Sequence, residues 1–125
     1  MYNMNTDILP KNMKIIENKI TTAELQALAK NMFGNLVKAV VDIKRGILAV
    51  DAELHADLEA LLMENGSQQK NLWGINLYPE LTGEDFVEFD SMINLRPSQD
   101  NRSRGVENPD IRKKIIEIVN KVVAK

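Results

Sequence analysis

The chain of 125 residues contains no cysteine and only one histidine. The absence of cysteine excludes disulfide bonds and every reaction that requires a thiolate. It also fits a reducing compartment, so we predict a cytoplasmic protein. Familiar catalytic motifs are missing as well: the sequence has no glycine-rich phosphate loop ending in Lys-Ser/Thr, and no GxGxxG, HExxH or GxSxG pattern.

Long apolar runs and a strong excess of one charge are also missing. No segment approaches the ~20 apolar residues that span a bilayer, and the first residues lack the apolar core of a secretory signal. We therefore expect no membrane partner. Lysine and arginine total 16 against 18 acidic residues, which gives a formal net charge of −2. This balance argues against a general nucleic-acid coat, although a local basic surface is compatible with it.

Hydrophobic periodicity predicts an α+β fold with the element order β-α-β-β-α-β-β-α. Short connections favour an antiparallel sheet of four to five strands with the helices packed on one face. We predict a loose N-terminal extension over residues 1–12 and a single α+β domain over residues 13–125. The predicted strands cover residues 14–20, 36–43, 47–52, 72–78 and 86–96, and the helices cover residues 21–33, 53–64 and 109–124.

The predicted strands have one apolar face and one polar face. Side chains alternate along a strand, so Asp42, Glu88 and Asp90 fall on the polar face. These carboxylates are candidate catalytic residues of a metal- or carboxylate-dependent hydrolase, as oxygen ligands of a cation or as acid and base. Alternatively, the polar face contacts water, or it pairs with a second copy of the chain in a homodimer. The other residues on this face are Lys38, Asn76, Tyr78, Asn94 and Arg96.

A polar loop lies between the last predicted strand and a helix whose start is marked by Asn108 and Pro109. Arginine presents a planar fork of donors that suits phosphate or carboxylate. We therefore predict that the loop binds an anionic, phosphate-bearing ligand or partner, which is a small molecule or a nucleic acid. The candidate ligand-binding residues are Arg96, Ser98, Asn101, Arg102, Ser103 and Arg104.

The same loop has a structural alternative, in which its arginines neutralise acidic residues of the sheet. Arg96 directly follows a predicted strand and can pair with Glu88 or Asp90. The single histidine, His55, lies in an acidic run, but its neighbours two residues away diverge from it on a helix, where only residues three or four apart share a face. We predict no metal site and no cofactor.

Three segments resemble an uncharacterised family of small prokaryotic proteins that is described only as a domain of unknown function. They are residues 37–67, residues 72–80 (LWGINLYPE) and residues 86–115, which contain the arginine loop. The resemblance implies a single cytoplasmic domain. It implies no activity and no catalytic residue.

Three functions remain open from the sequence. The first is a small cytoplasmic binding module that recognises an anionic group through the arginine loop, and we prefer it to an enzyme. The second is a hydrolase that uses the polar sheet face. The third is a structural or assembly protein that pairs through that face.

Overall fold

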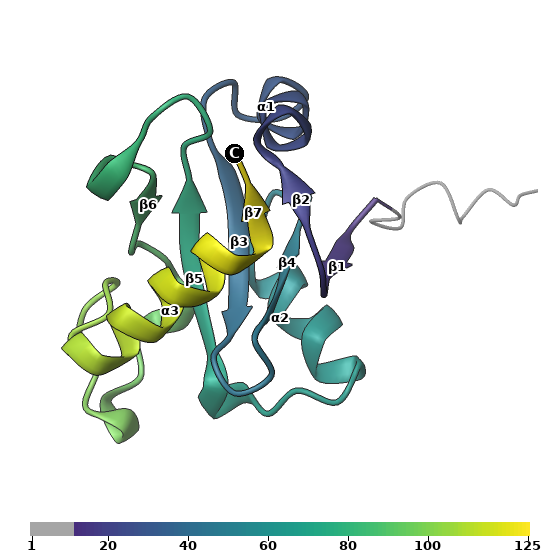
Figure 1. Ribbon diagram of the computed structural model, residues 1–125. Helices are drawn as coiled ribbons and strands as arrows, with labels where there is room; N and C mark the ends of the chain where they lie inside the picture. The colour runs from purple at the N-terminus through teal and green to yellow at the C-terminus, as the bar shows by residue number, and fades with distance from the viewer. Residues whose placement is uncertain (1–11) are drawn as a thin grey trace, which may run out of the picture.

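The computed structural model describes residues 12–125, and apart from Asn12 the predicted N-terminal extension lies outside this range. The predicted α+β class is confirmed. An antiparallel five-stranded sheet has the order β1-β4-β3-β5-β6, and β2 and β7 form a two-stranded parallel sheet (Figure 1). The elements are β1 (Lys14–Ile16), β2 (Ile20–Thr21), α1 (Thr22–Lys30), β3 (Val37–Asp42), β4 (Ile47–Val50), α2 (His55–Glu64), η2 (Gln69–Asn71), β5 (Leu72–Leu77), η3 (Gly83–Asp85), β6 (Val87–Glu88), η4 (Met92–Asn94), η5 (Pro97–Gln99), α3 (Pro109–Val122) and β7 (Val123–Ala124).

The starts of α1 and α3 follow from local sequence signals. At α1, the Glu24 N–H donates to Thr21 Oγ1 at 3.0 Å and the Thr21 N–H donates to Glu24 Oε1 at 2.9 Å. This reciprocal pair is a capping box. At α3, the Asn108 side chain accepts hydrogen bonds from two N–H groups of the first turn, and Pro109 is the first helical residue. Both starts lie where the sequence predicts them.

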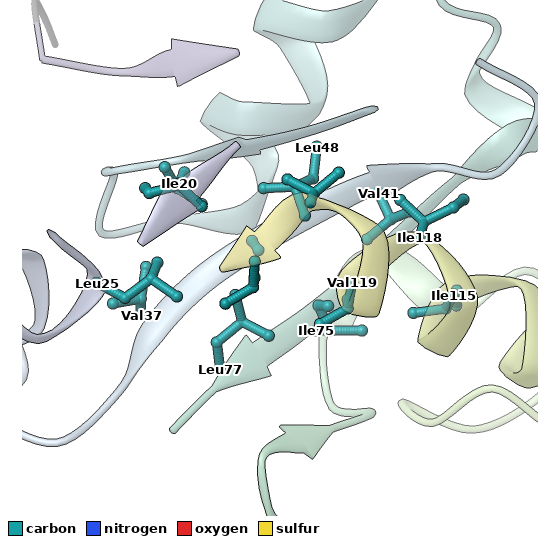
Figure 2. Close-up of a cluster of buried hydrophobic side chains, with 14 of the residues drawn as sticks. Ile20, Leu25, Val37, Val41, Leu48, Ile75, Leu77, Ile115, Ile118 and Val119 are labelled. Carbon is teal, nitrogen blue, oxygen red and sulfur yellow. The ribbon is translucent and has the colours of Figure 1, made fainter. Parts of the chain in front are cut away.

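One face of the five-stranded sheet is covered by α1 and α3 (Figure 1). Alternate residues of β3, β4 and β5 point to this side, as the period of two requires. Trp73 is fully buried here and Phe89 packs half-buried against the same cluster, so both lie on the predicted face. Figure 2 shows the core that they join, in which the labelled residues are Ile20, Leu25, Val37, Val41, Leu48, Ile75, Leu77, Ile115, Ile118 and Val119.

The helix α2 packs on the opposite face, so the prediction that the helices all cover one face is wrong. Val40 of β3 and Ala49 of β4 meet Leu58 and Leu62 of α2 in a second buried cluster. The reason is that β3 and β4 carry apolar residues on both sides. Such continuous apolar runs are typical of strands buried between two layers.

The predicted strand over residues 86–96 is also wrong, because regular pairing is limited to β6. Beyond β6 the Ser91 Oγ accepts the Ile93 N–H at 3.2 Å, a local turn that competes with a strand ladder. Asn94 then replaces a strand partner for β5. Its Oδ1 accepts the Gly74 N–H at 2.8 Å and its Nδ2 donates to the Gly74 carbonyl at 3.0 Å. One side-chain amide thus satisfies both backbone polar groups of Gly74.

Candidate functional site

A cleft of about 480 Å³ opens on the α2 side of the sheet, bordered by β6 and η4. Strand register aligns three of its side chains, because Lys38 of β3 pairs with Asn76 of β5, and Asn76 pairs with Glu88 of β6. The Cβ atoms of such cross-strand neighbours lie about 4.5–5.5 Å apart. The polar side chains that line the cleft are Lys38, His55, Asn76, Tyr78, Glu88, Asp90, Ser91 and Arg104.

The Glu88 carboxylate is held in place by two donors from β5 and the residue after it. Its Oε1 accepts hydrogen bonds from Asn76 Nδ2 at 2.9 Å and from the Tyr78 hydroxyl at 2.8 Å. The hydrogen bond to Glu88 is the main cause that raises the pKa of Tyr78, so the phenol stays protonated and remains a donor. Glu88 therefore presents a fixed negative charge to the cleft.

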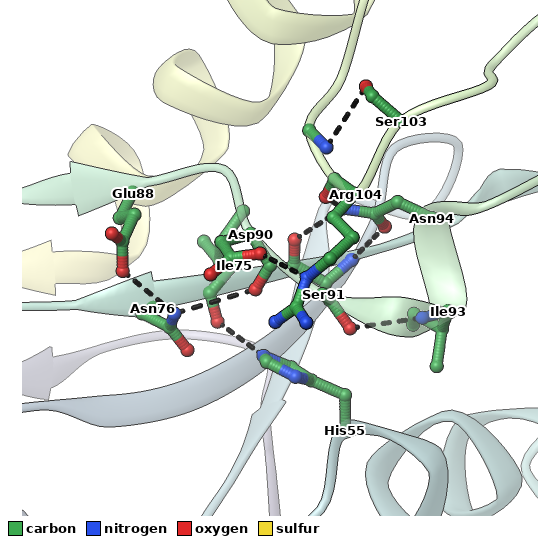
Figure 3. Close-up of polar contacts among 12 residues, drawn as sticks. His55, Ile75, Asn76, Glu88, Asp90, Ser91, Ile93, Asn94, Ser103 and Arg104 are labelled. Atoms are coloured by element: carbon green, nitrogen blue, oxygen red, sulfur yellow. Dashed lines mark hydrogen bonds and ion pairs between the residues drawn. The ribbon is translucent and has the colours of Figure 1, made fainter.

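The Asn76 side chain lies at the floor of the cleft and is only 6% exposed. Its Nδ2 faces Glu88 Oε1 and, at 3.4 Å, the Asp90 carbonyl (Figure 3). Both partners are acceptors, so the amide nitrogen must face them and Oδ1 must face away. Among residues 12–125 the buried Oδ1 has no hydrogen-bond partner. Such an unsatisfied acceptor costs about 1–3 kcal/mol.

One arginine of the polar loop reaches the cleft. Arg104 Nε donates to Asp90 Oδ1 at 2.6 Å, and these two side chains are 55% and 40% exposed (Figure 3). Because exposed ion pairs contribute only about 0–1 kcal/mol, the main effect of this pair is orientation. The Arg104 backbone is also fixed, since its carbonyl accepts hydrogen bonds from the Ser91 N–H and from Asn94 Nδ2. The terminal guanidinium nitrogens are thus presented to the cleft on a rigid support.

His55 is the first residue of α2 and is buried at the edge of the cleft. Its Nε2 lies 2.8 Å from the Ile75 carbonyl oxygen (Figure 3). Because a carbonyl cannot donate, Nε2 carries the proton. Burial lowers the pKa of His55 against the opposing effects of this hydrogen bond and of Asp90, so the imidazole is neutral at pH 7. The sequence pattern does not indicate this position of His55, because the helix predicted over residues 53–64 was expected on the other face of the sheet.

Arg96 stabilises the fold instead of lining the cleft. Its Nε donates to the Ile93 carbonyl at 2.9 Å, one terminal nitrogen donates to the Gln69 carbonyl at 2.9 Å, and the other donates to the Leu72 carbonyl. The guanidinium also lies 4.5 Å from the centroid of the Trp73 ring. Burial lowers the pKa of Arg96, but an arginine stays charged. The expected pairing of Arg96 with a sheet carboxylate is therefore wrong.

The rest of the polar loop is braced from within by Asn101, which is 2% exposed. Its Nδ2 donates to the carbonyls of Asn94 and Gly105, both at 2.8 Å, and its Oδ1 accepts the Glu107 N–H at 2.8 Å. The Ser103 Oγ accepts the Gly105 N–H at 3.2 Å. In the described chain, Arg104 is the one predicted ligand-binding residue that lines the cleft. Three other predicted ligand-binding residues, Ser98, Arg102 and Ser103, are exposed to solvent outside the cleft.

The three candidate catalytic carboxylates do not converge. Glu88 and Asp90 line the cleft, whereas Asp42 lies four residues along β3 from Lys38, about 13 Å at ~3.3 Å per residue. The Asp42 side chain is 1% exposed, and its Oδ1 accepts the N–H groups of the next turn, those of Lys44 and Arg45, at 2.9 Å each. It stabilises the β3–β4 hairpin.

The fold is that of a small α+β domain, and its cleft is lined by side chains of both charges. The chain belongs to the family described as "Protein of unknown function (DUF5674)", whose model matches residues 14–122. This confirms the resemblance to a domain of unknown function, while a prokaryotic origin stays a prediction. No curated protein matches the chain, and neither does any solved structure. Within residues 12–125, none of the helices has the length and apolar character needed to cross a membrane.

Proposed function

We propose that this protein is a binding module that takes a small polar ligand into the cleft and holds the ligand's anionic group with Arg104. The observation that supports the proposal is the exposed guanidinium of Arg104, which lines the cleft and is oriented by Asp90. The cleft volume of about 480 Å³ falls within the ~300–1,000 Å³ of small-molecule sites. Lys38 adds a second cation to the same lining.

This proposal narrows the predicted anion site from three arginines to one. Arg96 directs its donors to backbone carbonyls, and Arg102 is an exposed residue outside the cleft lining. The geometry therefore favours a small molecule in the cleft over a broad contact with the whole loop. The nucleic-acid partner, the homodimer and the cytoplasmic location stay predictions.

The hydrolase alternative has less support. Within residues 12–125, no three His, Asp or Glu side chains are grouped so that they can hold a metal ion. The serine hydroxyl in the cleft wall is that of Ser91, which is 1% exposed and is already hydrogen-bonded to the Ile93 N–H. A buried, engaged hydroxyl is a poor nucleophile. The assembly alternative also has less support, because α2 covers part of the sheet face through which two copies were predicted to pair.

The test compares Arg104→Gln with Arg102→Gln, a matched control from the same loop. Inorganic phosphate, acetate and L-leucine are titrated into ¹⁵N-labelled protein, and binding is followed through the amide shifts of β5, β6 and α2. We expect saturable shifts with at least one probe and a loss of roughly 1.5–3 kcal/mol in Arg104→Gln, about ten- to hundred-fold in Kd. Arg102→Gln should bind like the wild type.

Two outcomes contradict the proposal. One is an equal loss of affinity in both variants, which would indicate a general charge effect. The other is the absence of saturable shifts with every probe in the wild-type protein.

A further inference from the structure

We infer that the ligand is an α-amino acid with an apolar side chain, bound as a zwitterion. This inference rests on the proposed binding function and specifies its ligand. It depends on three features of the cleft, which are its balanced charge, the free carboxylate oxygen of Glu88 in the same cleft as Arg104, and its apolar rim.

The charges that line the cleft cancel. Lys38 and Arg104 are positive, Glu88 and Asp90 are negative, and the buried His55 is neutral. A phosphate or a nucleotide would bring two or more negative charges next to both carboxylates. Like charges in one site cost affinity, so the lining discriminates against polyanions. A ligand with one positive and one negative group meets an opposite charge at each end.

The acidic end of the cleft offers acceptors to an ammonium group. The Glu88 Oε1 is occupied by Asn76 and Tyr78, which fixes the carboxylate and leaves Oε2 for a ligand. An ammonium has donors and no acceptor, so it complements the free oxygen of this fixed carboxylate.

The other end of the cleft suits a carboxylate. Arg104 Nε is bonded to Asp90, and the two terminal nitrogens form the part of the fork that can bind a carboxylate in a bidentate manner. Glu88 and Asp90 are two residues apart, so their Cα atoms lie at most about 7 Å from each other. The Glu88 carboxylate and the Asp90-bound Arg104 therefore belong to one part of the cleft, as a molecule with both charged groups on one carbon atom requires.

The rim of the cleft is apolar. Leu54, at the N-cap of α2, is 56% exposed and Met92 of η4 is 62% exposed, and both line the opening. Large apolar side chains placed at the mouth of a polar site are well suited to cover an apolar part of a ligand. This combination favours amino acids such as leucine over glycine.

The experiment measures Kd for L-leucine and for its two halves, 4-methylpentanoate and 3-methylbutylamine, with inorganic phosphate as a fourth probe. We expect leucine to bind at least tenfold more tightly than either half. Glu88→Gln should weaken leucine at least fivefold without weakening 4-methylpentanoate, because glutamine keeps an acceptor for Asn76 and Tyr78 but lacks the charge that attracts an ammonium and repels a carboxylate. Glu84→Gln, an exposed carboxylate of η3, is the matched control and should change neither value.

The outcomes separate this inference from the proposed function. If 4-methylpentanoate or phosphate binds as tightly as leucine, the inference of a zwitterionic ligand is wrong, while the proposal that Arg104 binds an anion stands. If none of the four probes binds saturably, or if the amine alone equals leucine, both proposals are wrong.

Discussion

Gly74→Ala is expected to destabilise the protein, because β5 and the segment after β6 are in direct contact at this residue. A Cβ on residue 74 would lie 2.5 Å from Ser91 Cβ, 2.6 Å from Ser91 Oγ and 3.2 Å from His55 Cδ2. Carbon atoms in favourable contact are about 3.5–4.0 Å apart. Neither neighbour can simply rotate away, since the Ser91 N–H is bonded to the Arg104 carbonyl and the His55 ring is bonded to Ile75.

The size of the effect follows from two opposing contributions. Forcing extra atoms into a well-packed site costs about 1–3 kcal/mol, and replacing glycine by alanine recovers about 0.4–1 kcal/mol by restricting the unfolded chain. We therefore expect a net loss of about 1–2 kcal/mol in the free energy of unfolding. Urea unfolding followed by the fluorescence of the buried Trp73 measures this loss as a lower midpoint with an unchanged slope.

A double-mutant cycle isolates the contact itself. Ser91→Gly removes both atoms nearest to the new methyl group, so Gly74→Ala should cost less in the Ser91→Gly background than in the wild type. A wild-type urea midpoint for Gly74→Ala would show that the two segments are farther apart than the structure places them. A cycle that is additive within about 0.5 kcal/mol would show that the cost arises elsewhere.

Two further predictions concern Arg96 and His55. Arg96→Leu should lower the free energy of unfolding by about 1–3 kcal/mol, because it leaves backbone carbonyls without their charged donor. The control Arg102→Leu, on the exposed part of the loop, should change the free energy of unfolding by less than about 0.5 kcal/mol. Equal urea midpoints for the two variants would contradict the structural role of Arg96. Burial lowers the pKa of His55 below the ~6.5 of the unfolded chain. The contribution of His55 to stability is therefore complete above about pH 6.5 and is lost as the pH falls through the folded-state pKa. The loss is at most about 1.4 kcal/mol per pH unit. Unfolding curves between pH 7.5 and 4.5 measure this slope, which should be shallower in His55→Gln, and identical slopes would show that other groups control it.

The elements predicted correctly are those that short-range signals determine. The capping box of α1, the Asn108-Pro109 start of α3 and the apolar alternation of β5 all act within a few residues. Such signals can be recognised without knowing which distant residues come into contact. The side on which α2 packs could also have been inferred, because Val40 and Ala49 are apolar at positions that a solvated sheet face would fill with polar residues.

The segment after β6 could not be predicted in this way, because its conformation depends on contacts between distant residues. Its alternating sequence resembles a strand, yet Ser91 and Asn94 pack on Gly74 of β5, and Asn101 then bonds back to Asn94. No local pattern identifies these partners. For the same reason, the sequence indicated Glu88, Asp90 and Arg104 as candidate residues but did not show that they line one cleft. It also did not show that Asp42 and Arg96 lie outside that cleft.

The cleft itself is a consequence of how β5 loses its strand partner. β6 pairs only with Asn76 and Leu77, so the backbone polar groups of Gly74 need another partner. The Asn94 side chain satisfies Gly74, and His55, the first residue of α2, forms an additional hydrogen bond with the Ile75 carbonyl. A full-length β6 would occupy the edge where His55, Ser91 and the Arg104 backbone now meet. The Asn94 hydrogen bonds thus replace the strand, the His55 hydrogen bond ties α2 to the sheet at one point, and the polar side chains between them line the cleft.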